Sequence, residues 1–429
     1  MAGWDEAIWS PGDFQGRPRR DRLSGPYRRY VPDLLVRHPL VLESGLAQQA
    51  ADAERRIREL NMAGGDALAA ISRFLLRSEA IASSQIEGVA PSPRQVALAE
   101  LRDHEPVRGI SAQAELVANN MTIVREATTR LVQVDRVCVD DIIGLHRALL
   151  PDQPRLHGLR QQQNWIGGSS RHPLEADFVP PDPRRVPELM EDLVGYLNGA
   201  AHGPLVQAAM VHAQFETIHP FADGNGRVGR ALIHTVLARH SVTTTAVLPI
   251  SLVLATLSET YVEGLTDYRH GQDPSSESAQ RSIQGWLQTF IRAAAVAVEQ
   301  SMDLVRRLDE LRQEWTQRVA DHRSAQGMRP SPRSGSATAR LLATLTETPV
   351  LTTSTARRIL GVSFPAASSA LEELRQADVL RTRKIERNAT AYLADEVLDL
   401  LASTERRLGS TQFDTRRSPP GRPVPASPA

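Results

Sequence analysis

The stretch His219–Arg230 reads HPFADGNGRVGR, and it brings several chemically useful groups together in twelve residues. Its histidine is followed four positions later by the carboxylate of Asp223. Two glycines flank an asparagine, and glycines let a backbone approach a ligand closely. The residues after this stretch are apolar at helical spacing, so the glycines predict a loop that opens a helix.

This loop predicts a phosphate site with a proton acceptor beside it. The N-terminus of a helix offers backbone N–H groups and a partial positive charge, both of which suit a phosphate. Arg227 and Arg230 are three residues apart, so they share a helix face and can grip phosphate oxygens. Asp223 is a hard oxygen ligand suited to the Mg²⁺ that accompanies phosphates. His219 can accept a proton near neutral pH.

The composition excludes several classes of binding site and limits the number of domains. The chain has 429 residues, of which 41% are apolar and 23% charged, as in two or three ordinary globular domains. Formal charges balance, so the whole chain is not a polycation for nucleic acid or membranes. Cys138 is the only cysteine, which excludes a disulfide framework and a cysteine zinc site. We expect it to be a buried spectator within a helix, with a catalytic role as the alternative. Lys384 is the only lysine, so no Walker-type phosphate loop is present.

No segment predicts membrane insertion or secretion. The most apolar predicted helix, at about residues 287–298, contains Arg292. Asp5 and Glu6 lie early in the N-terminal region, where no continuous apolar segment follows. We therefore expect a cytoplasmic protein with no membrane partner.

Hydrophobic periodicity divides the chain into five predicted parts. The first part, residues 1–105, begins with an irregular, extended arm over residues 1–40. Two helices follow it, one ending near residue 57 and the other near residue 86. A core at 106–300 contains further helices and one pair of short extended segments at about 163–168 and 177–181. A helix and a Ser-, Arg- and Pro-rich linker occupy 301–336.

The last two predicted parts are a small domain and a tail. In residues 337–402, Thr353 is expected to cap a helix that ends at Leu360–Gly361, and Ser363 to cap a second helix. Two strands follow, and helix, helix, hairpin is the winged-helix order. Residues 403–429 are rich in Pro, Ser and Arg and predict a disordered tail.

The stretch His219–Arg230 resembles the signature of the Fic family, His-Pro-Phe-x-Asp-Gly-Asn-Gly-Arg-x-x-Arg, at every fixed position. The resemblance covers about residues 40–300. It implies a mostly α fold, with a Fic-type helical core, a β-hairpin flap and, here, a C-terminal winged-helix domain. The family's usual reaction moves AMP from ATP to a Ser, Thr or Tyr hydroxyl of a target protein and releases pyrophosphate.

The resemblance also implies a role for each matching residue. His219 corresponds to the general base and Asp223 to the Mg²⁺ ligand. The nucleotide phosphates would be held by the remaining loop positions: Gly224, Asn225, Gly226, Arg227 and Arg230. The family's phosphotransferases carry a lysine where Gly226 stands, so this form favours AMP transfer.

Two further stretches resemble family elements. Gln163, Asn164, Trp165 and Ile166 resemble the flap that clamps a target segment, because an exposed hairpin edge can pair with an extended peptide. The alternative is that the Trp165 side chain only packs against the core.

Ser83–Gly88 resembles the family's inhibitory motif, in which the glutamate pairs with the arginine that matches Arg230. Ser83 and Glu87 lie on one helix face, and Gly88 is expected to end that helix. A glutamate there is at the unfavourable end of the helix dipole, which invites a basic partner. The resemblance therefore implies that Glu87 prevents productive binding of the ATP γ-phosphate.

Alternatives remain for the C-terminal domain and for the reaction. Arg381, Arg383, Lys384 and Arg387 form a basic cluster on the expected wing, which favours DNA binding, whereas the expected recognition helix holds few arginines and favours a protein-interaction or dimerisation module. The chain as a whole could thus be a nucleotide-sensing DNA-binding regulator. The same site could also remove AMP from a modified protein, and a homodimer is one option for its assembly.

Overall fold

The computed structural model describes residues 2–10, 23–37, 40–63, 68, 71–102, 105–199, 201–386 and 389–411. The chain forms two compact units, each built from several segments. Unit 1 comprises Met1–Arg55, Ile123–Val242 and Glu259–Ala293, and unit 2 comprises Arg56–Thr122, Thr243–Ser258 and Ala294–Ala429. The fold is mostly α-helical, as the sequence predicts. Among the helices of the described residues, none has the length and apolarity needed to cross a membrane.

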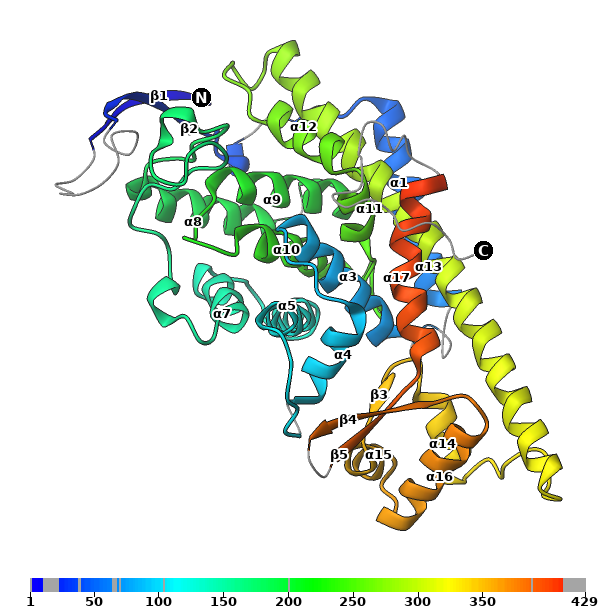
Figure 1. Ribbon diagram of the computed structural model, residues 1–429. Coiled ribbons are helices and arrows are strands. Elements are labelled where there is room, and N and C mark those ends of the chain that lie inside the picture. The colour runs from blue at the N-terminus through cyan, green and yellow to red at the C-terminus, as the bar shows by residue number, and fades with distance from the viewer. Residues whose placement is uncertain are drawn as a thin grey trace, which may run out of the picture. The chain divides into compact units, whose positions relative to one another are not determined.

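Unit 1 is centred on the two helices that meet at the signature loop. α9 (Pro204–Ile218) packs against α10 (Asn225–Arg239), and α8 (Val186–Leu197) packs against α9 (Figure 1). α9 is buried from Leu205 onward on every face, and its buried polar side chains find partners, as Gln207 and Gln214 do with backbone carbonyls. Around this pair lie shorter helices of the same unit: α6 (Arg130–Gln133), α7 (Val139–Leu149) and α12 (Ser258–Tyr268).

The N-terminal region differs from the irregular arm that the sequence predicts. β1 (Gly3–Trp9) and β2 (Gly25–Val31) pair as an antiparallel hairpin. Tyr30 is buried with Phe178, and its N–H donates to the carbonyl oxygen of Val179 (2.9 Å). The prediction of an irregular arm was wrong because the Pro-, Gly- and Arg-rich residues lie mainly between the two strands. The strands themselves include Trp, Tyr and Ile, which favour strands.

Unit 2 contains the helix that ends in the Ser83–Gly88 motif. α3 (Ser72–Ile86) packs against α11 (Ile250–Thr256), and a buried carboxylate joins them: Glu79 accepts hydrogen bonds from the N–H (2.9 Å) and the hydroxyl (2.5 Å) of Ser251. Within the same unit, α17 (Asp395–Thr411) packs against α4 (Pro93–Arg102) and α11.

The C-terminal part of unit 2 has the element order that the sequence predicts, with one added strand. Its elements are α14 (Ala337–Thr344), β3 (Val350–Leu351), α15 (Thr353–Leu360), α16 (Phe364–Gln376), β4 (Arg381–Glu386) and β5 (Ala389–Leu393). The antiparallel sheet has the order β3-β5-β4, an arrangement compatible with a winged helix. Ser363 caps α16 as predicted, but Thr352 rather than Thr353 caps α15, because it is the Thr352 hydroxyl that accepts the N–H of Thr355.

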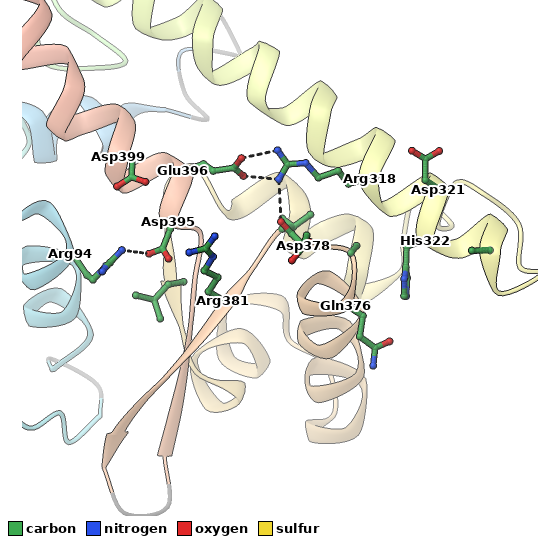
Figure 2. A pocket seen from close by; sticks show the side chains of 14 residues that line it. Arg94, Arg318, Asp321, His322, Gln376, Asp378, Arg381, Asp395, Glu396 and Asp399 are labelled. Carbon is green, nitrogen blue, oxygen red and sulfur yellow. Dashed lines mark hydrogen bonds and ion pairs between the residues drawn. The ribbon is translucent and has the colours of Figure 1, made fainter. Parts of the chain in front are cut away.

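Ion pairs join the start of α17 to neighbouring helices of unit 2, beside these C-terminal elements. Arg94 of α4 pairs with Asp395 (2.7 Å), and Arg318 of α13 (Glu277–Ala325) pairs with Glu396 (2.7 Å) and donates to the carbonyl oxygen of Asp378 (3.1 Å) (Figure 2). They surround a polar hollow of about 740 Å³. Two ion pairs, Arg94–Asp395 and Arg318–Glu396, occupy part of its lining, and we assign the hollow no ligand.

Several other elements of the structure differ from those predicted from the sequence. The helix predicted at about residues 287–298 is part of the much longer α13, which also extends through most of the predicted helix and linker at 301–336. α17 continues to Thr411, so residues 403–411 are helical where the sequence predicts a tail. Cys138 is exposed at the N-cap of α7, so the expectation of a buried residue inside a helix was wrong.

Candidate functional site

His219 ends α9 in a backbone conformation that is uncommon for a residue with a side chain. Its φ is 50° and its ψ is 60°, in the left-handed region, and its N–H donates to the carbonyl oxygen of Phe215 (2.8 Å). The side chain keeps 19% of its surface exposed. Strained conformations of this kind persist where surrounding contacts enforce them, often at functional sites.

The signature loop is closed by its own asparagine. The Asn225 side chain accepts the N–H of Phe221 (2.8 Å) and donates to the carbonyl oxygen of Phe221 (2.8 Å). Both ends of the amide are therefore used, and Asn225 is buried. Any contact of Asn225 with a phosphate would come from its backbone N–H, which belongs to the first turn of α10 and has no partner within the helix. Gly224 precedes that turn with a φ of 79°.

The predicted metal ligand and phosphate clamp differ in exposure. Asp223 exposes 57% of its side chain, accepts the Gly224 N–H at Oδ1 (2.6 Å) and lies 3.5 Å from Arg227 Nη2. Arg227 and Arg230 are almost completely buried and have polar interactions within the protein. Burial, and after it the charge of Arg230, lower the pKa of His212 to about 3.

The exposed carboxylate of Asp223 fits a limited magnesium site. Its Oδ1 atom is engaged by Gly224, while the side chain remains open to solvent. Across the described segments, no three His, Cys, Asp or Glu side chains gather into a metal-binding group. Mg²⁺ often takes one or two protein carboxylates and fills its other positions with water and substrate phosphates. Asp223 fits a Mg²⁺ site of that type, in which phosphate supplies the remaining charge.

A buried carboxylate beside His219 was not predicted from the sequence. Glu216 Oε2 lies 3.9 Å from His219 Nδ1, and the Glu216 side chain is 8% exposed. A Cβ atom added at Gly229 of α10 would lie 2.7 Å from Glu216 Oε1 and 3.0 Å from Phe215. Glycine at this position therefore lets the two helices approach with the carboxylate between them. The signal was available, since Glu216 precedes His219 by three residues on the last turn of α9.

Arg160 holds the backbone on which His219 sits, and no neighbouring residue in the sequence indicates this role. Its Nε donates to the carbonyl oxygen of His219 (2.9 Å) and its Nη2 to those of Pro181 (2.6 Å) and Ile218 (3.4 Å). The Arg160 N–H also donates to the carbonyl oxygen of Pro220 (2.8 Å). Burial lowers the pKa of Arg160 to about 10, which leaves the guanidinium charged near neutral pH.

The residues predicted as a flap lie next to this loop. Asn164 Nδ2 donates to the carbonyl oxygens of His219 (3.3 Å) and Phe221 (3.0 Å). Gln163 Nε2 donates to the carbonyl oxygen of Pro180 (2.9 Å). Asn164 thus supports the signature loop from the flap, a role the sequence did not predict.

The flap itself is shorter than a regular hairpin. Ile166 and Phe178 form a single antiparallel bridge, and the Ile166 side chain is exposed. Trp165 is half-buried, and its Nε1 donates to the carbonyl oxygen of Ser169 (2.6 Å). Its ring meets the edge of Trp9 at 5.5 Å between centroids. Trp165 therefore packs against the N-terminal hairpin, which is compatible with either of the two predicted roles.

α7 supports the signature loop through a histidine that was also missed. His146 is fully buried, its Nε2 lies 3.0 Å from the carbonyl oxygen of Asp223, and its ring stacks on Phe221 at 4.0 Å between centroids. Burial lowers the pKa of His146 to about 4, so the ring is neutral near pH 7.

The Ser83–Gly88 stretch ends α3 as predicted. Gly88 has a φ of 75° and donates its N–H to the carbonyl oxygen of Gln85 (2.9 Å), which confirms that it terminates the helix. Ser83 is buried, whereas Glu87 is exposed at the C-cap. The pairing of Glu87 with Arg230 remains a prediction.

Comparison with known proteins identifies related sequences and related folds. Residues 136–237 match the model of the Fic/DOC family. Protein adenylyltransferase fic-1 of Caenorhabditis elegans is 26% identical over 192 residues, 44% of this chain and 34% of the relative. Protein adenylyltransferase Fic of Drosophila ananassae is 31% identical over 202 residues, 43% of this chain and 38% of the relative.

The structural comparison covers more of the chain. A Fic family protein from Desulfovibrio desulfuricans aligns with a TM-score of 0.52 and 21% identity, over 83% of this chain and 98% of that one. The chain spans about a third of the length of the curated relatives it matches. The likeness to the solved structure supports the fold, and the sequence matches concern the part that holds the signature loop.

Proposed function

The chain contains a Fic/DOC family domain at residues 136–237, and from this premise we propose that it is a protein adenylyltransferase. It would transfer AMP from ATP to a Ser, Thr or Tyr hydroxyl of a target protein and release pyrophosphate. The observation that carries the proposal is the junction of α9 and α10, where a strained histidine and the first turn of a helix share one short loop. The named adenylyltransferase relatives support the same reaction.

In the proposed mechanism, His219 removes the proton of the target hydroxyl. The hydroxyl oxygen then forms a bond to the α-phosphorus of ATP while the bond to the bridging β-phosphate oxygen breaks, and pyrophosphate leaves. Glu216 lies 3.9 Å from Nδ1, so it would stabilise the imidazolium that forms, and we assign the base role to Nε2. A positioned base contributes about 10²–10⁴ in rate.

Charge on the phosphates would be met by the loop and by α10. Backbone N–H groups of Asn225, Gly226 and Arg227 lie in the first helical turn, where they have no intrahelical acceptor. Asp223 would hold Mg²⁺, which neutralises phosphate charge when bound. The guanidinium groups of Arg227 and Arg230 are buried, so phosphate binding would need their side chains to exchange protein contacts for phosphate oxygens.

We further propose that Glu87 inhibits the enzyme by pairing with Arg230. Glu87 is exposed at the end of α3, and Gly88 fixes where that helix stops. An arginine that is held by a glutamate cannot grip the γ-phosphate at the same time. The flap would align the target segment through Gln163, Asn164, Trp165 and Ile166. Ile166 would present the exposed edge for pairing.

One labelling experiment tests the reaction. The full chain is incubated with Mg²⁺ and ATP labelled at the α- or the γ-phosphate, as wild type, Glu87→Gly and His219→Ala. We expect α-label on protein, an increase in Glu87→Gly and a loss in His219→Ala. Label from the γ position alone would identify a phosphotransferase and refute AMP transfer. An equal rate in wild type and Glu87→Gly would refute the inhibitory role. Release of AMP from previously modified protein would identify the reverse activity.

A second candidate function is DNA binding by the C-terminal part of unit 2. β4 exposes Arg381, Arg383 and Lys384, while Arg387 lies outside the described residues. DNA binding through these cations would weaken steeply with salt. A mobility shift that is lost on replacing Arg383 and Lys384 by glutamine would support it, and the absence of any salt-sensitive shift would exclude it.

A further inference from the structure

The peptide between Asp223 and Gly224 is held at both of its polar ends. Its N–H donates to Asp223 Oδ1 at 2.6 Å, and its carbonyl oxygen lies 3.0 Å from His146 Nε2. A carbonyl oxygen only accepts, so His146 must carry its proton on Nε2. The bond from His146 sets the plane of this peptide, and the bond from the Gly224 N–H holds the Asp223 carboxylate in a fixed position relative to that plane. Together they fix the orientation of the Asp223 side chain.

The element that supplies His146 is itself rigidly placed. His146 is fully buried on α7, and its ring lies nearly parallel to Phe221, with 7° between planes. One turn further along the helix, Leu149 Cδ2 would lie 2.8 Å from a Cβ atom added at Gly224. The loop can approach α7 this closely only because position 224 is glycine, and the approach brings the Asp223 carbonyl within reach of the imidazole.

The remaining nitrogen of His146 shows that the ring is not shared with another polar group. Nδ1 is buried and has no hydrogen-bond partner among the described residues. An apolar ring would satisfy the stacking on Phe221 without leaving a buried nitrogen unsatisfied, and a buried polar atom without a partner is unfavourable. A histidine at this position is thus explained by the one bond it makes to the Asp223 carbonyl.

We infer that His146 is a positioning residue for the metal-binding carboxylate: it fixes the Asp223–Gly224 peptide so that Asp223 presents its outer oxygen to a phosphate-bound divalent cation. This inference rests on the proposed function, since it requires Asp223 to bind Mg²⁺. Partners that orient a metal ligand in this way commonly contribute 10- to 100-fold to metal affinity.

Two variants separate the hydrogen bond from the stacking. His146→Phe keeps an aromatic ring against Phe221 but cannot donate, whereas His146→Gln keeps an N–H donor at about the same reach. All measurements use the Glu87→Gly background of the full chain, so that inhibition does not mask binding. The probe is α,β-methylene-ATP, which cannot release pyrophosphate, and its Kd is measured by calorimetry with Mg²⁺ and with EDTA.

We expect His146→Phe to reduce the Mg²⁺-dependent gain in affinity about tenfold, with the Kd in EDTA unchanged, and His146→Gln to restore most of it. An unchanged gain in His146→Phe overturns the inference. An equal loss of affinity with Mg²⁺ and with EDTA also overturns it, because His146 would then shape the whole loop. If the background protein binds the probe but gains nothing from Mg²⁺, Asp223 is not a metal ligand and the inference fails. If it does not bind the probe at all, the proposed function itself fails.

Discussion

Replacing Arg160 tests whether the backbone around His219 depends on a single buried guanidinium. We consider Arg160→Met, which keeps an unbranched side chain of similar reach and removes every donor. The variant loses the bonds to His219 (2.9 Å) and Pro181 (2.6 Å), together with the longer ones to Gln162 (3.2 Å) and Ile218 (3.4 Å). Asn164 still donates to the His219 carbonyl, so that oxygen keeps one partner.

The expected loss of stability follows from the two short bonds. A hydrogen bond to a charged group contributes about 1.5–3 kcal/mol, and the retained Asn164 bond reduces the loss at His219, so we expect about 3 kcal/mol. For a folded unit of roughly 200 residues this lowers the melting temperature by about 6–12 °C. The His219 backbone would also relax from its left-handed conformation, and a displacement of about 1 Å at a catalytic group can lower the rate about 100-fold.

The assay combines thermal unfolding with transfer from α-labelled ATP. Arg160→Lys keeps the charge and at least one donor, so we expect about half the loss of stability. Arg281→Met is the matched control, since Arg281 of α13 pairs with the carboxylate of Glu277 (2.7 Å) and both side chains are largely exposed, at 68% and 90%. Exposed pairs contribute about 0–1 kcal/mol. A melting temperature of Arg160→Met equal to that of Arg281→Met would refute the reasoning.

Three further predictions concern the same loop and its supports. Gly229→Ala places a methyl group 2.7 Å from Glu216 Oε1, so the carboxylate must move, and we expect α-label transfer to fall at least about tenfold; an unchanged rate would show that Glu216 does not assist the base. Asn225→Ala removes both bonds to the Phe221 backbone and should lower the free energy of unfolding by about 2 kcal/mol in urea. Asn225→Asp keeps the acceptor but sets a second acceptor oxygen against the Phe221 carbonyl, so it should lose at least as much, and a smaller loss would contradict the role of the Asn225 donor. Burial lowers the pKa of His212 from 6.5 to about 3, so the folded state binds fewer protons than the unfolded state and stability present above pH 6.5 is lost as the pH falls toward 3; melting temperatures of wild type should fall more steeply below pH 6.5 than those of His212→Gln, and parallel curves would contradict this.

The sequence predicted the site best where the physical cause is local. Gly224 lies just before the first turn of α10, and His219 lies just after the last turn of α9. Both belong to the signature, and the loop and the helix after it lie where the signature predicts them. Gly88 likewise ends α3 through its own positive φ. Such features depend on a few consecutive residues, so a single sequence contains the information.

The contacts that fix the loop are long-range, and no periodicity encodes them. Arg160 bonds a carbonyl 59 positions away, and His146 one that is 77 positions away. β3 has two residues, too few to show alternation, and was missed for that reason. The N-terminal strands were missed because their pairing partner lies beyond an intervening Pro- and Arg-rich segment.

The three residues that hold the signature loop in place share one property. His146, Arg160 and Asn164 all bond backbone carbonyls of the loop and leave the side chains of His219 and Asp223 for chemistry. Residues outside a motif can therefore control it without touching a reacting group. Arg160 and Asn164 share one acceptor, the His219 carbonyl, so their effects should be coupled.

A double-mutant cycle tests that coupling. Either single variant leaves the His219 carbonyl with one donor, while Arg160→Met combined with Asn164→Ala removes both. A buried acceptor without a partner costs about 1–3 kcal/mol, so the double variant should lose about 1 kcal/mol more stability than the sum of the single variants. Pairing Arg160→Met with Arg281→Met provides the control, because Arg281 pairs only with the exposed Glu277 among the contacts described and its effect should add independently. Additive losses in both cycles would mean that the carbonyl finds another donor, and the shared-acceptor account of how His219 is held would be wrong.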